Sequence, residues 1–237
     1  MVKLHIITPV KDSVSTALHT IEQVMNSDEK GFKYTVYNDY STDETKNALI
    51  KDAAEKGYSL LHLEDLTNHP SPNYLLVLQH AQQQALKDKC PLLIIESDVL
   101  VTKTTISQLL KLTNDLKKPG MIASVTTDAA GNVNFPYLYA TSYPSATGAT
   151  RKRLSFCCTL LTNEFLSSYN FGNLNPEKNW YDVFISRQSI AEGFTNYLAM
   201  DIPVVHLPHS SRPWKLEKYT NPLRYYWKKI TKRRDKI

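Results

Sequence analysis

Short apolar runs alternate with segments of helical period along the first 125 residues of this chain. The runs that read as strands lie at residues 3–8, 32–37, 58–63 and 91–95. This alternation is typical of βαβ units, which build a mostly parallel sheet with helices on both faces. The run 91–95 is apolar throughout, as expected of a central strand that is buried on both faces. The sequence therefore predicts an α/β fold.

Turn and cap signals place the first helices. Apolar residues recur at helical spacing between residues 14 and 25. The tetrapeptide Ser41-Thr42-Asp43-Glu44 reads as a capping box, in which Ser41 caps the first free amides of a helix and Glu44 reaches back. The pair Ser71-Pro72 predicts an N-cap and a first-turn proline for a helix that runs to about residue 89.

The second half of the chain is less regular. After a helix near 104–116 and a strand at 121–125, residues 126–150 read as a long mobile loop. The elements expected beyond it are a strand at 154–161, a short helix from residue 163, a helix at 181–191 and a strand near 196–200. We expect one domain over residues 1–213, with a donor half at 1–125 and an acceptor half at 126–213, and a separate tail at 214–237.

Length and cysteine content narrow the class of protein. A chain of 237 residues suits one α/β domain with a sizeable core. The three cysteines include no C-x-x-C pair, which argues against a disulfide framework and a zinc site and favours a reduced compartment. No signal peptide and no apolar run of membrane-spanning length is evident. We therefore expect a cytoplasmic protein.

Acidic residues follow two of the expected strands. Asn38 and Asp39 follow the second strand, and ligands in open α/β sheets bind beyond the carboxyl ends of strands. Asp39 can accept the imide proton of uracil or a ribose hydroxyl. The alternative is that Asp39 and Asp43 only add negative charge to a helix start.

Glu96-Ser97-Asp98 follows the most apolar strand. Carboxylates at i and i+2 of an extended strand project to the same side. Glu96 and Asp98 could then share a hard divalent cation, Mn²⁺ or Mg²⁺, whose preferred ligands are oxygens. The alternative is a solvated strand end.

Three segments together resemble glycosyltransferase family 2. They are Thr8-Pro9-Val10, the run Asn38-Asp39-x-Ser41-Thr42-Asp43-x-Thr45, and the acid-x-Asp of Glu96 and Asp98. The resemblance covers roughly the first 125 residues. It implies the GT-A fold and an inverting transfer from a nucleotide sugar. The donor contacts it implies are Thr8, Pro9, Val10, Asn38, Asp39 at the base, Glu96 at the ribose and Ser97, with Asp98 as the ligand of Mn²⁺ or Mg²⁺.

The resemblance extends to the second half of the chain. Asp182, near the start of an expected helix, matches the position where the family has an acid that deprotonates the acceptor hydroxyl, and Trp180 and Tyr181 could stack on a sugar. Asp182 could instead be a plain helix cap. His206 and His209 follow the last expected strand, where related enzymes often place a His as an extra metal ligand or phosphate contact, and His206 is the preferred candidate. Either histidine could instead be structural.

Three positions and one segment depart from the family pattern. Tyr40 stands where the family has Gly, which predicts that the turn after Asp39 avoids a positive φ. Glu96 replaces the first Asp of the family's acid-x-Asp, and Tyr181 replaces a Glu. Residues 78–81 take the place of the family's Arg-Asn-x-Gly segment. These departures bear on the identity of the donor more than on the fold.

The C-terminal tail, residues 214–237, is basic and aromatic. From residue 215 it carries nine Lys or Arg against two acids, interleaved with Tyr and Trp. Such a segment could lie on an anionic membrane surface, which would place the protein peripherally on the inner face of the cell membrane. A solvated helix packed on the domain is the alternative. No nucleic acid is expected as a partner, since nothing else resembles a nucleic-acid module.

The expected function is a metal-dependent transfer of a sugar, with a UDP-sugar favoured, to a carbohydrate or lipid-linked acceptor in cell-surface polysaccharide or glycolipid synthesis. One rival is a catalytically inactive nucleotide-binding or membrane-docked scaffold of the same fold. The other is a sugar nucleotidyltransferase, which would need a Gly-rich phosphate loop after the first strand. Residues 9–12 lack those glycines.

Overall fold

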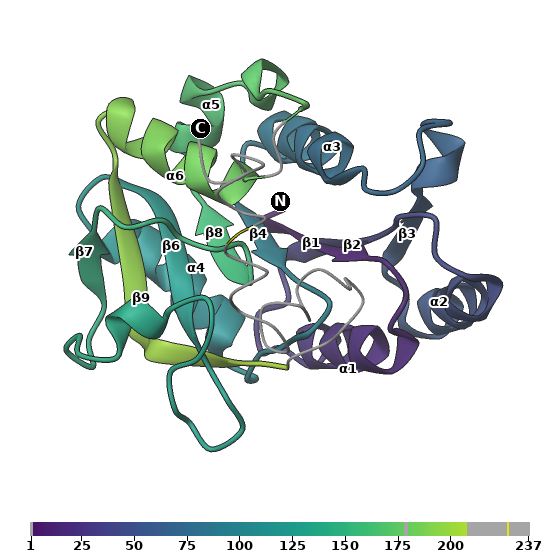
Figure 1. Ribbon diagram of the computed structural model, residues 1–237, viewed down its shortest axis with the longest axis horizontal. Helices are drawn as coiled ribbons and strands as arrows, with labels where there is room; N and C mark the ends of the chain where they lie inside the picture. The colour runs from purple at the N-terminus through teal and green to yellow at the C-terminus, as the bar shows by residue number, and fades with distance from the viewer. Residues whose placement is uncertain (1, 178–179, 208–226, 228–237) are drawn as a thin grey trace. The chain divides into compact units, whose positions relative to one another are not determined.

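The computed structural model describes residues 2–177, 180–207 and 227. Within them the chain forms a nine-stranded sheet in the order β3-β2-β1-β4-β8-β6-β9-β5, with β7 paired to β9 (Figure 1). The strands are β1 (Leu4–Val10), β2 (Phe32–Asn38), β3 (Ser59–His62), β4 (Leu92–Ile95), β5 (Val99–Leu100), β6 (Pro119–Thr127), β7 (Gly148–Thr150), β8 (Cys158–Leu161) and β9 (Thr195–His206).

The sheet is mixed but mostly parallel. β1, β2, β3 and β4 run parallel to one another. β8 lies antiparallel between β4 and β6, so β6 points the same way as β4, and β9 pairs parallel to β6. Only β5, β7 and β8 oppose this direction within the described part of the chain. The predicted α/β class is confirmed.

Helices cover both faces of the sheet. α1 (Val14–Met25), α2 (Asp43–Lys56) and α4 (Thr105–Asp115) contribute to one apolar cluster. α3 (Tyr74–Asp88), α5 (Asn163–Ser168) and α6 (Tyr181–Ala191) contribute to the other.

The strand β4 is apolar throughout because each of its two faces packs into a different apolar cluster. Leu93 and Ile95 belong to the first cluster, whereas Leu92 and Ile94 belong to the second. All four side chains are fully buried, and each contributes about 1.5–3 kcal/mol relative to an exposed position.

The start of α2 differs from the expected capping box. α2 begins at Asp43, and its N-cap residue, Thr42, makes no side-chain cap bond. The Ser41 hydroxyl instead accepts a hydrogen bond from the backbone N–H of Asp12 at 2.9 Å, and the Asp12 carboxylate accepts one from the Thr42 N–H at 2.8 Å. The predicted capping box is wrong, because Ser41 joins the loop after β2 to the loop after β1.

The start of α3 also differs. The helix begins at Tyr74 after the N-cap residue Asn73, so Ser71 and Pro72 precede it. The Ser71 hydroxyl donates to the carboxylate of Asp39 rather than capping the helix. The predicted role of Ser71-Pro72 as N-cap and first helical residue is therefore wrong.

Residues 126–150 are more ordered than a plain loop. β6 extends to Thr127, a 3₁₀ turn spans Leu138–Ala140, and β7 pairs with β9. The Tyr137 side chain is 1 % exposed and lies in the second apolar cluster. The prediction of a long mobile loop is wrong, since this segment contributes both to the core and to the sheet.

The basic tail lies outside the described residues apart from Trp227, a helical residue whose side chain is exposed. His209 also lies outside them. No helix in the described part of the chain is long and apolar enough to cross a bilayer.

Candidate active site

Parallel strands bring the expected site residues to one edge of the sheet. The register of β1 against β2 sets Val10 beside Asn38, and the Asp39 N–H donates to the Val10 carbonyl at 2.8 Å. β4 runs parallel to β1 and ends at Ile95, so Glu96 leaves the sheet at this same edge. The carboxyl ends of β1, β2 and β4 therefore frame the candidate site.

Glu96 and Asp98 lie in a tight turn rather than on an extended strand. The Val99 N–H donates to the Glu96 carbonyl at 3.1 Å, which closes the turn between β4 and β5. The predicted extended i, i+2 arrangement is wrong. Each of the two carboxylates lies close to the imidazole of His206.

His206 ends β9 and is oriented by two contacts. Its Nδ1 lies 2.8 Å from the Phe135 carbonyl oxygen, and its Nε2 lies 3.4 Å from Asp98 Oδ2. Because a carbonyl only accepts, Nδ1 carries a hydrogen and Nε2 is the nitrogen that faces the carboxylates. Burial alone would lower the pKa of His206, but the hydrogen bond and charge of Asp98 and the charge of Glu96 raise it above its usual value.

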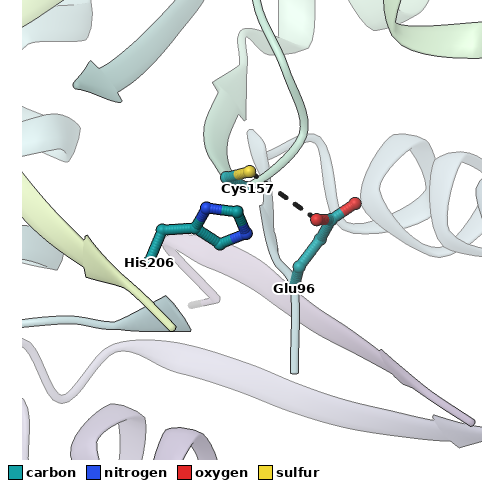
Figure 2. A group of neighbouring side chains, drawn as sticks. All are labelled: Glu96, Cys157 and His206. Atoms are coloured by element: carbon teal, nitrogen blue, oxygen red, sulfur yellow. Dashed lines mark hydrogen bonds between the residues drawn. The ribbon is translucent and has the colours of Figure 1, made fainter. Parts of the chain in front are cut away.

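Cys157 joins this group (Figure 2). Its thiol donates to Glu96 Oε2 at 3.6 Å, and the ligand atoms of Glu96, Cys157 and His206 all lie within 4.8 Å of one another. No sequence signal identifies Cys157, because it is far from Glu96 along the chain. The antiparallel register that pairs Ile95 with Cys158 brings the two together.

The side-chain atoms at this site are suitable ligands for a divalent cation. Asp98 and Glu96 supply carboxylate oxygens, and His206 supplies an imidazole nitrogen whose ring is held through its other nitrogen. Such an outer contact is typical of metal-binding histidines. Oxygen and imidazole ligands suit Mn²⁺, and the oxygens alone suit Mg²⁺.

Asp39 is engaged by its own chain. Its Oδ2 accepts from the Ser71 hydroxyl at 2.7 Å and the Asn73 N–H at 3.0 Å, and its Oδ1 accepts from the Asn73 amide at 2.8 Å. An ionised carboxylate has about four acceptor positions, so these bonds leave one on Oδ1. Asp39 is thus fixed in orientation by the segment before α3.

Asn38 is also fixed by internal contacts. Its amide nitrogen lies 2.9 Å from His62 Nδ1, and its Oδ1 accepts from the Ser41 N–H at 3.3 Å. The side chain is buried. In this structure Asn38 joins β2 to β3 and shapes the turn that follows Asp39.

The segment Thr8-Pro9-Val10 mostly faces the interior. The Thr8 hydroxyl is buried and accepts a hydrogen bond from Tyr34 at 2.8 Å, and Val10 lies in the first apolar cluster. Only Pro9 keeps partial exposure. Ser97, in the turn after β4, is nearly buried as well.

The loops at this edge hold strained backbone. Asp12, Ser13 and Tyr40 adopt φ values of 58°, 57° and 55°. The expectation that Tyr40 avoids a positive φ is wrong, although the left-handed conformation costs a non-glycine residue about 1–2 kcal/mol. The Lys11 ammonium donates to the Tyr40 carbonyl, and the Tyr40 hydroxyl donates to the Thr67 carbonyl. Such strain is concentrated at functional sites in proteins.

Asp182 lies in the first turn of α6. Arg153 Nη1 lies 3.0 Å from its Oδ2, and the Asp182 side chain is 20 % exposed. Burial raises the pKa of Asp182 above its usual value, and the charge of Arg153 opposes this increase. A carboxylate with a raised pKa is suited to accept a proton near neutral pH.

The two aromatic residues before Asp182 have different environments. Tyr181 is 6 % exposed and stacks on Tyr74, with ring centroids 6.4 Å apart. Trp180 is half-buried. Tyr181 therefore belongs to the core, and Trp180 is the ring with surface left for a ligand.

Residues 153–157 connect the two groups of side chains. Arg153 contacts Asp182 at one end of this segment, and Cys157 contacts Glu96 at the other. Four residue steps span at most about 14 Å. The candidate base and the carboxylate cluster are therefore supported by the same short stretch of backbone.

The segment 78–81 does not reach the site. Leu78 and Ala81 are buried in α3, and His80 Nδ1 lies 2.8 Å from the Tyr37 hydroxyl. This departure from the family pattern serves the packing of α3 on β2.

No family model matches this sequence, and no curated protein matches it either. Solved structures do match it. A mannosyltransferase of Pyrobaculum calidifontis, PcManGT, in complex with GDP-Man and Mn²⁺, superposes with a TM-score of 0.68 at 15 % identity, over 97 % of this chain and 64 % of that one.

Two structures of S. aureus TarS 1–349 also match. One has a TM-score of 0.64 at 15 % identity, over 86 % of this chain and 60 % of that one. The other, in complex with UDP-GlcNAc, has a TM-score of 0.65 at 16 % identity, over 89 % of this chain and 60 % of that one. The chain thus spans about three-fifths of the length of the proteins it resembles. At such identities the likeness concerns the fold, and the fold of this chain is that of the GT-A glycosyltransferases.

Proposed function

We propose that this protein is a divalent-metal-dependent, inverting glycosyltransferase that uses a nucleotide-sugar donor. The observation that carries the proposal is the convergence of Glu96, Asp98 and His206 at the carboxyl edge of a GT-A sheet. This edge is where open α/β sheets bind their ligands. The donors of the matched structures, GDP-Man and UDP-GlcNAc, belong to the same chemical class.

Asp39 is the proposed contact to the base. Three internal hydrogen bonds fix its carboxylate and leave one acceptor position on Oδ1. That position suits the imide N–H of uracil, so a UDP-sugar is the favoured donor. Glu96 is the proposed ribose contact, and Pro9 and Ser97 lie at the same edge.

Asp98 and His206 are the proposed ligands of Mn²⁺ or Mg²⁺. A bound divalent cation would supply positive charge to the diphosphate of the leaving nucleotide. The backbone of this chain holds both ligand residues in place. The Leu207 N–H donates to the Asp98 carbonyl at 2.8 Å, and the Phe135 carbonyl fixes the imidazole.

Asp182 is the proposed base. Its carboxylate would take the proton of the acceptor hydroxyl, and Trp180 would contact the acceptor sugar. One base is sufficient for an inverting displacement, because no covalent enzyme intermediate is needed. A carbohydrate or lipid-linked acceptor of cell-surface polysaccharide or glycolipid synthesis follows from the family resemblance.

A cytoplasmic position at the inner face of the cell membrane is proposed through the basic tail. Deleting residues 215–237 should reduce sedimentation with anionic liposomes, since about 1 kcal/mol is expected for each cation near the surface. Unchanged sedimentation of the truncated protein would rule out this role for the tail.

Titration calorimetry with UDP, GDP and dTDP, each with and without Mn²⁺, tests the donor site. We expect UDP to bind in the presence of Mn²⁺ and Asp98→Asn to abolish the metal-dependent part. The matched control is Asp115→Asn, because Asp115 is a half-exposed acid at the end of α4. No nucleotide binding by the wild type would favour an inactive, membrane-docked scaffold.

Asp182→Asn tests the base. We expect this variant to bind the donor like wild type and to lose transfer, because an amide cannot accept the proton. Equal transfer rates for the variant and the wild type would exclude Asp182 from that role.

A further inference from the structure

The thiol of Cys157 adds a soft ligand to a site otherwise made of hard donors. Cys157 precedes β8 and is 2 % exposed, and its sulfur contacts Glu96 Oε2 at 3.6 Å and the Ser155 hydroxyl at 3.4 Å. Among the described residues, Glu96, Cys157 and His206 form the one group of three such side chains close enough to share an ion. The catalytic proposal has no use for the thiol.

We propose that Glu96, Cys157 and His206 form a zinc site that overlaps the proposed Mn²⁺ site. Thiolate and imidazole together favour Zn²⁺, whereas carboxylate and phosphate oxygens favour Mn²⁺ and Mg²⁺. Zn²⁺ bonds of about 2.0–2.3 Å in a tetrahedral shell place ligand atoms about 3.3–3.8 Å apart. The observed ligand atoms lie within 4.8 Å of one another, so side-chain shifts of about 1 Å would bring all three to bonding distance. The fourth position of the tetrahedron would be left to a water molecule.

The three side chains come from separate elements, as Figure 2 shows. Glu96 follows β4, Cys157 precedes β8 and His206 ends β9. The Phe135 carbonyl already holds His206 Nδ1 and leaves Nε2 as the metal-binding nitrogen, as is common for zinc ligands. A thiolate is the ligand form of Cys157, so binding releases the thiol proton.

Zinc bound at this site would occupy Glu96 and His206, which could then no longer contact the ribose of the nucleotide sugar or Mn²⁺. Zinc and the nucleotide–Mn²⁺ complex would then exclude each other, and zinc would act as an inhibitor of the transfer. This consequence rests on the proposed function, whereas the zinc site does not.

Titration of the full chain with Co²⁺ under reducing conditions tests the site. We expect a near-ultraviolet thiolate-to-cobalt absorption band that saturates at one equivalent and is displaced by Zn²⁺. Cys157→Ser should abolish the band and weaken zinc binding by about tenfold or more. The matched control is Cys90→Ser, which alters another buried cysteine and should keep the band.

A wild type without the band, or a band that persists in Cys157→Ser, would overturn the proposal. If Cys157→Ser does not fold, the zinc X-ray absorption spectrum of the wild type decides. One sulfur at about 2.3 Å supports the site, and a shell of nitrogen and oxygen alone refutes it. Calorimetry with UDP and Mn²⁺ remains a separate test, so failure of one proposal is distinguishable from failure of the other.

Discussion

The ion pair of Arg153 with Asp182 offers a quantitative test of the proposed base. Arg153→Gln removes the cation that lies 3.0 Å from Asp182 Oδ2. Burial raises the pKa of Asp182, and Arg153 opposes this increase, so the substitution should raise the pKa further. The ionised carboxylate then becomes less favourable at every pH.

The magnitude follows from the exposure of the pair. The Arg153 side chain is 37 % exposed and the Asp182 side chain 20 %, so solvent screening limits the interaction to about 0.5–1 kcal/mol. A loss of about 0.5–1 kcal/mol changes the ratio of ionised to protonated Asp182 by about two- to fivefold. On the acid limb of the pH–rate profile, kcat/KM should fall by about that factor, because only the ionised form accepts a proton.

The free energy of unfolding gives a second measure that needs no activity. The folded pKa of Asp182 lies above the unfolded one, so its contribution to stability is fully present below the unfolded pKa and is lost as pH rises through the folded pKa. Arg153→Gln enlarges that loss. The variant should match wild type at acid pH and be about 0.5–1 kcal/mol less stable at neutral pH.

Urea unfolding at acid and neutral pH, together with the pH–rate profile, measures both effects. Arg151→Gln is the matched control, since Arg151 is an exposed cation two positions away. High salt should reduce the stability difference, because the pair is partly exposed. An unchanged acid limb and equal stability of Arg153→Gln and wild type at neutral pH would refute the electrostatic coupling.

Two backbone predictions test the fold itself. Gly120→Ala should destabilise the protein by about 3 kcal/mol, because the added Cβ would lie 2.1 Å from Ser189 Oγ. Gly148→Ala, where the nearest atom is 3.9 Å away, should leave the urea midpoint unchanged, and equal midpoints for both variants would contradict the packing. Lys89→Gly should stabilise the protein by about 0.5 kcal/mol, because Lys89, the C-cap residue that follows α3, has a φ of 53°. A lower midpoint for Lys89→Gly would contradict this expectation.

The local sequence was enough to predict those helices and strands whose hydrophobic pattern lies within a single continuous segment. α6 spans Tyr181–Ala191 as the sequence indicates, and β4 is buried on both faces as its four apolar residues require. Both depend on hydrophobic periodicity, which is a property of neighbouring residues. The acids after β2 and β4 also lie at one edge, because parallel strands share their direction.

The errors concern residues whose partners are distant in the chain. Ser41 caps no helix because Asp12, in another loop, supplies its partner. Tyr40 accepts a positive φ because Lys11 and Thr67 bind its carbonyl and its hydroxyl. The role of Ser41 and the backbone conformation of Tyr40 depend on contacts between distant residues, which a local sequence pattern does not reveal.

The sequence by itself determined the α/β class, the order of the helices and of the strands other than β5 and β7, and the strand end that carries Glu96 and Asp98. The tertiary structure alone decided that β8 enters antiparallel beside β4, that His206 reaches Asp98, and that Cys157 reaches Glu96. The physical reason is that periodicity and turn chemistry act over a few residues. A ligand cluster, in contrast, requires the register between strands that are 60 or more residues apart.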